Sequence, residues 1–204
     1  DKAHFANCRF LGCQDTIFTG PLPPKPIEGN SFGGPKEGHE RRMVRQYFED
    51  CYIKGDVDFI FGSATAVFNR CEIFSNNRDM EVNGYITAAS TPEGEAFGYV
   101  FTDCRFTSDA PAGTVYLGRP WRNYAKTVFI NCWMGEHIKA EGWHNWNKTE
   151  AEASTYYAEY NSSGPGAPDK RVKWAKLLSE DDISQYSIKN ILKGKDNWNP
   201  VMKE

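Results

Sequence analysis

A phenylalanine and a cysteine recur together along this chain at a fixed separation. Five cysteines each follow a phenylalanine by three positions and precede a large apolar residue by two; the pairs are Phe5–Cys8, Phe48–Cys51, Phe68–Cys71, Phe101–Cys104 and Phe129–Cys132. These segments are short, rich in aromatic and β-branched residues and bounded by Gly, Asn and Asp, whereas a helical repeat spaces its apolar residues by about 3.6. The repeat therefore predicts an all-β fold, a right-handed parallel β-helix in which each unit adds one coil.

The cysteines at this repeated position are expected to stack as a ladder of small apolar side chains inside the coil. Ladder geometry rarely gives the dihedral angle that a disulfide requires, so we expect free, buried thiols rather than bridges. The sequence has no CxxC pair and no Cys/His cluster with zinc spacing. We therefore expect no metal site.

Two aspartates occupy the same phase of the repeat. Asp15 lies seven residues after Cys8, and Asp58 lies seven residues after Cys51. On successive coils such residues are one strand spacing apart, about 4.8 Å. Two carboxyl groups that close do not ionise independently, which suits acid/base or covalent chemistry. From spacing alone, the alternative is that both aspartates hydrogen-bond to turn backbone.

A glycine- and proline-rich insertion separates these two aspartates. Ten of the nineteen residues from Gly20 to Gly38 are Gly or Pro, and removing them leaves one ordinary coil between the cysteines. The segment 20–38 is thus a loop insertion, either a plain surface excursion or a lid over a groove. In the second case Arg41, Arg42 and Arg45 would meet anionic groups of a substrate.

The C-terminal part departs from the repeat. Residues 143–160 are aromatic and irregular and are interpreted as a tail laid along the solenoid. Ser179 and Asp182 form a capping box and Gly194 is a stop signal, which predicts a short C-terminal helix packed on the last turns. The expected organisation is one domain, 1–204, with the insertion 20–38 and a tail and helix over 143–204.

Composition limits the possible partners. The 204-residue chain with 40% hydrophobic residues has enough apolar surface for a core, and it has no run long enough to span a bilayer. The net charge of −3 gives no general attraction to polyanions, so nucleic acid is not an expected partner. No signal peptide is visible in residues 1–5, where a core strand is expected to begin at once.

Three strings carry a family resemblance: CQDTIF at 13–18, DVDFIFG at 56–62 and YLGRPW at 116–121. With these strings in this order, the chain resembles the pectin methylesterase (pectinesterase) family of carbohydrate esterases. The resemblance extends to YAEYNSSGPGA at 157–167 and WNP at 198–200. The N-terminal portion of the family pattern, with a further glutamine that helps to hold the oxyanion, is missing and would precede residue 1.

The resemblance implies roles for four residues. Asp58 matches the nucleophile, which attacks the ester carbonyl of methylated galacturonate, and Arg119 would keep its carboxylate ionised and oriented. Asp15 matches the acid that protonates departing methanol and then activates water as a base. Gln14 would donate a hydrogen bond to the tetrahedral oxyanion.

The resemblance also implies a substrate platform and a setting. Trp121 and Phe61 would pack against sugar rings, with the core as the alternative location for Phe61. The further candidates for lining the groove are Tyr116, Thr87 and Arg122. The implied activity is that of a carboxylic ester hydrolase acting on pectin without a cofactor, as a monomer, secreted or periplasmic.

Two other functions remain open at this stage. Another β-helix polysaccharide enzyme, a lyase of the pectate lyase type or a hydrolase of the polygalacturonase type, would also use carboxylates on this scaffold. A non-catalytic carbohydrate-binding solenoid is the second alternative, because the N-terminal glutamine is missing. A serine esterase is disfavoured, since the sequence has no GxSxG motif.

Overall fold

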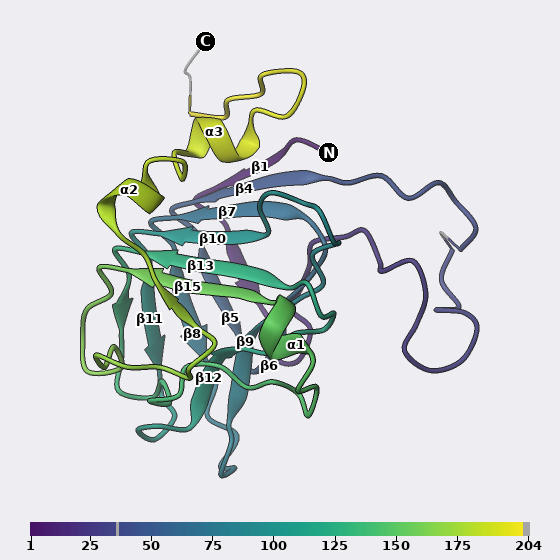
Figure 1. Cartoon of the computed structure of the whole chain (residues 1–204). Coiled ribbons are helices and arrows are strands. Elements are labelled where there is room, and N and C mark those ends of the chain that lie inside the picture. The colour runs from purple at the N-terminus through teal and green to yellow at the C-terminus, as the bar shows by residue number, and fades with distance from the viewer. Residues whose placement is uncertain (36, 202–204) are drawn as a thin grey trace.

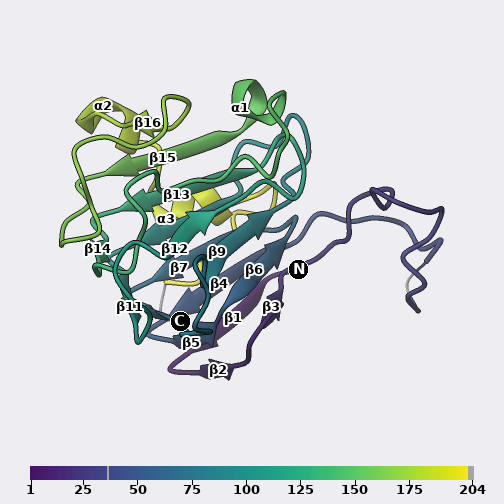
Figure 2. The ribbon, with the colours of Figure 1, turned by 90° about the horizontal axis from the view of Figure 1, so that it is seen from below.

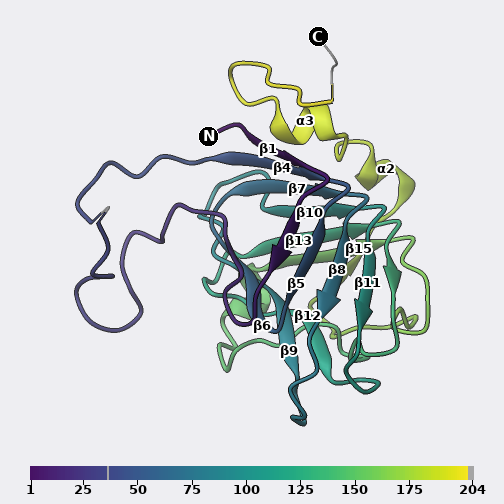
Figure 3. The ribbon, with the colours of Figure 1, turned by 180° about the vertical axis from the view of Figure 1, so that it is seen from behind.

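The chain winds into a right-handed parallel β-helix, which confirms the fold predicted from the repeat. The computed structural model describes residues 1–35 and 37–201. All strand pairings found among these residues are parallel, and each of the first four coils adds one strand to each of three sheets (Figures 1 and 3).

The strands described in the structure divide among the three sheets as follows. The largest sheet contains β1 (Ala3–Ala6), β4 (Arg45–Glu49), β7 (Thr65–Asn69), β10 (Tyr99–Thr102), β13 (Lys126–Ile130), β15 (Tyr156–Tyr160) and β16 (Lys176–Leu177). The second contains β2 (Arg9–Leu11), β5 (Tyr52–Gly55), β8 (Glu72–Ser75), β11 (Arg105–Ser108) and β14 (Trp133–Met134). The third contains β3 (Ile17–Phe18), β6 (Val57–Gly62), β9 (Gly84–Ala89) and β12 (Val115–Gly118).

The repeated phenylalanines form a continuous stack in the core. They pair in register on adjacent strands of the largest sheet, and successive ring centroids are 4.9, 4.6, 4.5 and 4.9 Å apart from Phe5 to Phe129. Their interplanar angles stay at or below 19°, so each ring lies nearly flat on the next. This ladder accounts for the phenylalanine spacing in the sequence.

The cysteines of the repeat line the turn after these strands. All six thiols are free; Cys51, Cys71, Cys104 and Cys132 are buried, whereas Cys13, which lies outside the repeat, is exposed. Each buried Sγ donates a hydrogen bond to the carbonyl of the phenylalanine on the preceding coil, at 3.3–3.6 Å. The cysteine is thus both a small core side chain and a link between coils.

The residue before each of these cysteines has a left-handed backbone. The φ angle lies between 52° and 55° at Asn7, Asp50, Arg70, Asp103 and Asn131. Asn and Asp tolerate this conformation better than most residues, which explains why four of the five are Asn or Asp. This left-handed residue turns the chain from the largest sheet into the second sheet.

The segment 143–160 is a further coil, so its interpretation as an irregular tail is wrong. Trp143 bridges to Gly118 of the third sheet, and β15 pairs with β13 along its whole length. Glu159 stands opposite Phe129, where the repeat would place phenylalanine. Its carboxylate is paired with Arg171 (Nε–Oε1 2.6 Å), and this buried ion pair replaces the next step of the ladder.

The predicted C-terminal helix is divided into two. The capping box is confirmed, because Ser179 N donates to Asp182 Oδ2 and Asp182 N donates to Ser179 Oγ, but α2 (Glu180–Ile183) ends after four residues. Ser187 then caps a new helix, α3 (Ile188–Leu192), and Gly194 follows with φ 51°.

This C-terminal segment reaches back to the first coils rather than to the last turns alone (Figure 1). Ile191 and Leu192 of α3 pack with Tyr47 and Val67 on the outer face of the largest sheet. A third short helix, α1 (Ala151–Ser154), precedes β15.

Residues 19–44 link β3 to β4 and contain no strand or helix where they are described. This loop extends away from the body of the solenoid in all three views (Figures 1, 2 and 3). It includes the predicted insertion and starts directly after the strand that follows Asp15.

Candidate active site

Asp58 and Arg119 form a two-pronged ion pair on the third sheet. Arg119 Nε donates to Asp58 Oδ1 at 2.8 Å and Nη2 donates to Oδ2 at 2.7 Å. Both side chains are largely buried, at 9% exposure for Asp58 and 16% for Arg119. This arrangement fixes the plane of the carboxylate and favours its charged form.

The strand that carries Asp58 is irregular at that residue. Its pairing with β9 shifts between Val57 and Ile60, and Asp58 has a φ of 51°. A β-bulge of this kind re-aims a side chain out of the regular alternation. The bulge therefore explains how Asp58 reaches Arg119 while Phe59 and Ile60 stay in the core.

Arg119 is placed by the end of β12. Its amide N donates to Thr87 O, and a Cβ on the preceding Gly118 would collide with Thr87 Oγ1. Only glycine permits that approach between β12 and β9. The glycine of the LGRPW string thus fixes the position of the backbone from which the Arg119 side chain extends.

Asp15 occupies the predicted place beside Asp58. The register pairs Ile17 with Ile60 and Phe18 with Phe61, and Asp15 N donates to Val57 O at 3.1 Å. Asp15 shares the left-handed backbone of Asp58, with a φ of 56°. The two aspartates therefore lie at equivalent points of adjacent coils, Asp15 exposed and Asp58 buried.

The pKa values of both carboxyl groups are raised, for different reasons. Burial raises the pKa of Asp58, and the hydrogen bonds and positive charge of Arg119 oppose that rise. Although the side chain of Asp15 reaches solvent, its pKa is raised first by partial burial and then by the negative charge of Asp58, and the positive charge of Arg119 opposes this rise. The cation beside Asp58 thus favours its charged form, and the negative charge of Asp58 favours the protonated form of Asp15.

Gln14 lies next to Asp15 and is exposed, so its amide is accessible from solvent. Its role as oxyanion donor stays a prediction.

An aromatic strip borders the aspartates. Phe61 is half-buried, and its ring centroid lies 5.0 Å from Phe18 and 5.8 Å from Trp121. Phe32, from the loop 19–44, meets Trp121 edge-on at 6.5 Å. Phe61 is thus not part of the fully buried core and belongs to a partly exposed apolar surface that could take a pyranose face.

The remaining groove candidates are placed differently. Arg122 donates to Trp121 O and, at 2.7 Å, to Lys25 O, so it ties the loop 19–44 to the residues after Arg119. Tyr116 is half-buried and stacks on Tyr85 at 5.3 Å. Thr87 is fully buried and donates to Leu117 O, so its expected place in the groove is wrong.

The three arginines that follow the insertion do not gather at the site as the lid hypothesis expects. Arg41 Nε donates to Leu22 O within the loop, and Arg42 pairs with Glu40. Arg45 pairs with Asp1 and Asp196 at the edge where the C-terminal segment returns.

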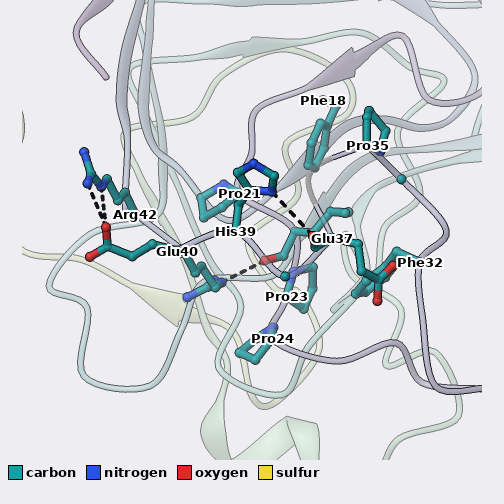
Figure 4. Close-up of a pocket in the computed structure, with 14 residues that line it drawn as sticks. Phe18, Pro21, Pro23, Pro24, Phe32, Pro35, Glu37, His39, Glu40 and Arg42 are labelled. Atoms are coloured by element: carbon teal, nitrogen blue, oxygen red, sulfur yellow. Dashed lines mark hydrogen bonds and ion pairs between the residues drawn. The ribbon is translucent and has the colours of Figure 1, made fainter.

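The loop itself encloses a pocket of about 860 Å³ (Figure 4). Its lining includes four prolines and two phenylalanines together with charged side chains of Glu and Arg, and Phe18 also belongs to the aromatic strip.

Sequence reasoning missed Tyr85 and Trp146. The ring centroid of Tyr85 is 3.8 Å from Arg119 Cζ, and that of Trp146 is 3.7 Å from the same atom. Neither residue lies in one of the three strings. The one available signal is the aromatic density of WHNW at 143–146, which the tail interpretation set aside.

Neither a metal-binding cluster nor a membrane-spanning helix occurs within residues 1–35 and 37–201. That part of the chain contains no group of three or more His, Cys, Asp or Glu side chains placed to hold a metal ion. It also contains no helix with the length and apolar character needed to cross a bilayer.

Comparison with known proteins gives a consistent result. The family model described as Pectinesterase matches residues 38–195. Pectinesterase 31 of Arabidopsis thaliana is 37% identical over 188 residues, which cover 91% of this chain and 51% of that protein. The chain spans about half the length of the curated relatives it matches.

Solved structures agree in fold. The pectin methylesterase from carrot superposes with a TM-score of 0.75 at 27% identity, over 99% of this chain and 61% of that one. A pectin methylesterase in complex with a hexasaccharide superposes with a TM-score of 0.73 at 30% identity, over 100% of this chain and 59% of that one.

Proposed function

This chain belongs to the pectinesterase family, and from that premise we propose that it hydrolyses methyl esters of polygalacturonate, the backbone of pectin, to free carboxylates and methanol. The observation that carries the proposal is the Asp58–Arg119 ion pair with Asp15 at the same register on the adjacent coil. A carboxylate that is charged and fixed in plane, next to a second carboxyl group that holds a proton, is the pair that ester cleavage through an acyl-enzyme needs. A solved relative complexed with a hexasaccharide supports an oligosaccharide ligand.

The proposed first step uses Asp58 as the nucleophile. One carboxylate oxygen attacks the ester carbonyl carbon, and the electron pair of the C=O bond moves to oxygen, where Gln14 donates a hydrogen bond. As the C–O bond to methoxide breaks, Asp15 delivers its proton to the leaving oxygen, which departs as methanol. The product is an anhydride between Asp58 and the sugar carboxyl group.

The second step returns the enzyme to its starting state. Asp15, now ionised, takes a proton from a water molecule, and the oxygen attacks the anhydride carbonyl. The bond to Asp58 breaks, which releases the sugar carboxyl group as a carboxylic acid and restores the charged Asp58 beside Arg119; the acid then loses its proton to solvent and becomes the free carboxylate. No redox partner is required, and protons balance over the cycle.

Product analysis with three variants tests this proposal. Wild type, Asp58→Asn and Asp15→Asn are incubated with highly methylated pectin, and both methanol and chain length are measured. We expect no methanol from Asp58→Asn, a loss of about 10²–10⁴-fold for Asp15→Asn, and unshortened chains throughout.

Asp103→Asn is the matched control, because Asp103 is an exposed aspartate with the same left-handed backbone (φ 54°) on another coil. Shortened chains would instead identify a lyase or hydrolase. Equal methanol from wild type and Asp58→Asn would end the assignment of the nucleophile.

We also propose the setting implied by such a substrate. The polymer is extracellular, so the protein would act as a secreted or periplasmic monomer and bind pectin through the aromatic strip of Phe18, Phe61 and Trp121. Nucleic acid is not a proposed partner, since the net charge is −3.

A further inference from the structure

Arg119 must bridge a gap of one coil to reach Asp58. Asp58 lies on β6 and Arg119 follows β12, and β9 pairs with both strands between them. Two strand spacings amount to about 9.6 Å. The long side chain of Arg119 therefore crosses the intervening coil before its guanidinium group meets the carboxylate, and its orientation there needs support.

Two aromatic rings provide that support. Tyr85 stands on β9, the intervening strand, with its ring centroid 3.8 Å from Arg119 Cζ, and Trp146 covers the same carbon at 3.7 Å. Two rings at this distance occupy opposite faces of the planar group, because one face has no room for both. The guanidinium group is thus held between two π surfaces, with its edge free to donate to Asp58.

Tyr85 is itself held in place. Its ring stacks on Tyr116 of the next strand with an interplanar angle of 5°, and His144 meets both tyrosine rings edge-on at 5.8 and 5.3 Å. The pairing of Tyr85 with Tyr116 follows from the register of β9 and β12. The ring of Tyr85, on one face of the guanidinium group, is therefore held in place by the sheet.

Trp146 is held by an irregular segment. Its backbone has a φ of 57°, unusual for so bulky a residue, and its amide N donates to His144 Nδ1 at 2.9 Å. Lys148 Nζ donates to Pro120 O and Trp121 O, which ties this segment to the residues directly after Arg119. Backbone strain of this kind concentrates at functional sites, where the surrounding structure maintains it.

We propose that Tyr85 and Trp146 are positioning residues, an aromatic clamp that keeps the guanidinium group of Arg119 coplanar with the Asp58 carboxylate throughout the reaction. The inference rests on the proposed function for its kinetic consequence. When Asp58 is consumed in the acyl-enzyme, its charge disappears and Arg119 loses its partner. The clamp then holds Arg119 in place so that the same ion pair forms again when the anhydride is hydrolysed.

The test compares Trp146→Ala with Trp146→Phe, which keeps a ring. Without the clamp, Arg119 samples other rotamers and the turnover number kcat falls by about tenfold to a hundredfold, while KM stays nearly constant. Because Asp58 then loses part of its counter-charge, the acid limb of kcat/KM moves up by about one pH unit. The phenylalanine variant retains kcat to within about threefold.

The titration is interpretable because all variants keep the other groups that face Asp58. These are Asp15 on the preceding coil, Arg119, Lys148 on the segment after Trp146, and Tyr157 on β15. A carbon-13 NMR titration of the Asp58 carboxyl group gives the same pKa without any turnover. If wild type releases no methanol, the proposed function fails, and this titration still decides the clamp.

Two further variants guard against misfolding and general packing effects. Tyr85→Leu removes the opposite π face with less loss of volume, and we expect it to move the acid limb in the same direction. Trp133→Ala is the matched control, since Arg105 Cζ lies 4.5 Å over Trp133 on the second sheet; it should leave kcat and the acid limb unchanged. A folded Trp146→Ala with kcat within twofold of wild type (about 0.4 kcal/mol) and an unmoved Asp58 titration would overturn the proposal.

Discussion

Replacing Arg171 by methionine tests how the last coil is held against the solenoid. Arg171 and Glu159 are both at least nine-tenths buried, and Nε lies 2.6 Å from Oε1. Arg171 also donates to Gly166 O at 2.9 Å and to Lys139 O at 3.1 Å. These bonds connect β15 to the segment at Lys139 and to the loop at Gly166.

The expected loss of stability follows from the buried carboxylate that the substitution leaves without a partner. Arg171→Met keeps the apolar volume but leaves Glu159 as a buried carboxylate without its cation, which lowers the free energy of unfolding by about 3–5 kcal/mol. For a chain of this size the melting temperature falls by about 2–4 °C per kcal/mol, or about 6–20 °C in total. The double variant Glu159→Phe/Arg171→Met restores the phenylalanine of the repeat opposite Phe129 and should recover most of this loss, to within about 2 kcal/mol of wild type.

Urea denaturation of wild type, both single variants and the double variant completes a double-mutant cycle. We expect a coupling energy of about 2 kcal/mol or more. If the two single effects simply add, or if Arg171→Met costs less than about 1 kcal/mol, the ion pair does not substitute for a step of the phenylalanine ladder and the argument from register is refuted.

Three other predictions concern pH, the loop and the ladder. The profile of kcat/KM for methanol release should be bell-shaped, because activity is lost as Asp58 becomes protonated at low pH and as Asp15 loses its proton at high pH. Since burial raises the pKa of Asp58, the acid limb should lie above the ordinary pKa of an aspartate, about 3.9. A flat profile between about pH 4 and pH 9 would contradict both roles. Deletion of residues 21–37 removes the aromatic contact of the loop with Trp121 and should raise KM for long pectin by about two- to tenfold with little change in kcat; unchanged KM on all substrates would show that the loop is a plain surface excursion. Phe101→Ala interrupts the core stack between two neighbours and should lower the unfolding free energy by about 3–5 kcal/mol in thermal or urea denaturation, and a loss below about 1 kcal/mol would mean that the stack adds little.

The repeat in the sequence predicted those parts of the fold in which the same kind of residue recurs at the same position of each coil. The phenylalanine ladder and the cysteines behind it follow directly from register, because parallel coils place equivalent residues one above another. The adjacency of Asp15 and Asp58 follows for the same reason. These features need no knowledge of the loops, whose lengths vary freely between coils.

Other features of the structure were not predicted from the sequence, because they depend on exceptions to the repeat. The last coil was missed since Glu159 replaces the expected phenylalanine, and only the distant Arg171 makes that replacement tolerable. The helix boundary was missed because Ser187 offers a second cap within an otherwise helical pattern. The contact of Trp146 with Arg119 depends on a left-handed backbone at Trp146, which no propensity favours.

The site extends along the solenoid axis because successive coils contribute its members one at a time. Asp15, Asp58, Tyr85, Arg119 and Trp146 come from five consecutive coils, over four strand spacings or about 19 Å. A shift of one residue in β9 would turn Tyr85 to the opposite face of the sheet and remove it from the row. Insertions between strands leave the row intact, whereas an insertion of one residue within β6 would displace Asp58 from the bulge that aims it at Arg119. The pairing register of the coils therefore fixes the relative positions of the site residues, and the stability of the phenylalanine ladder depends on the same register.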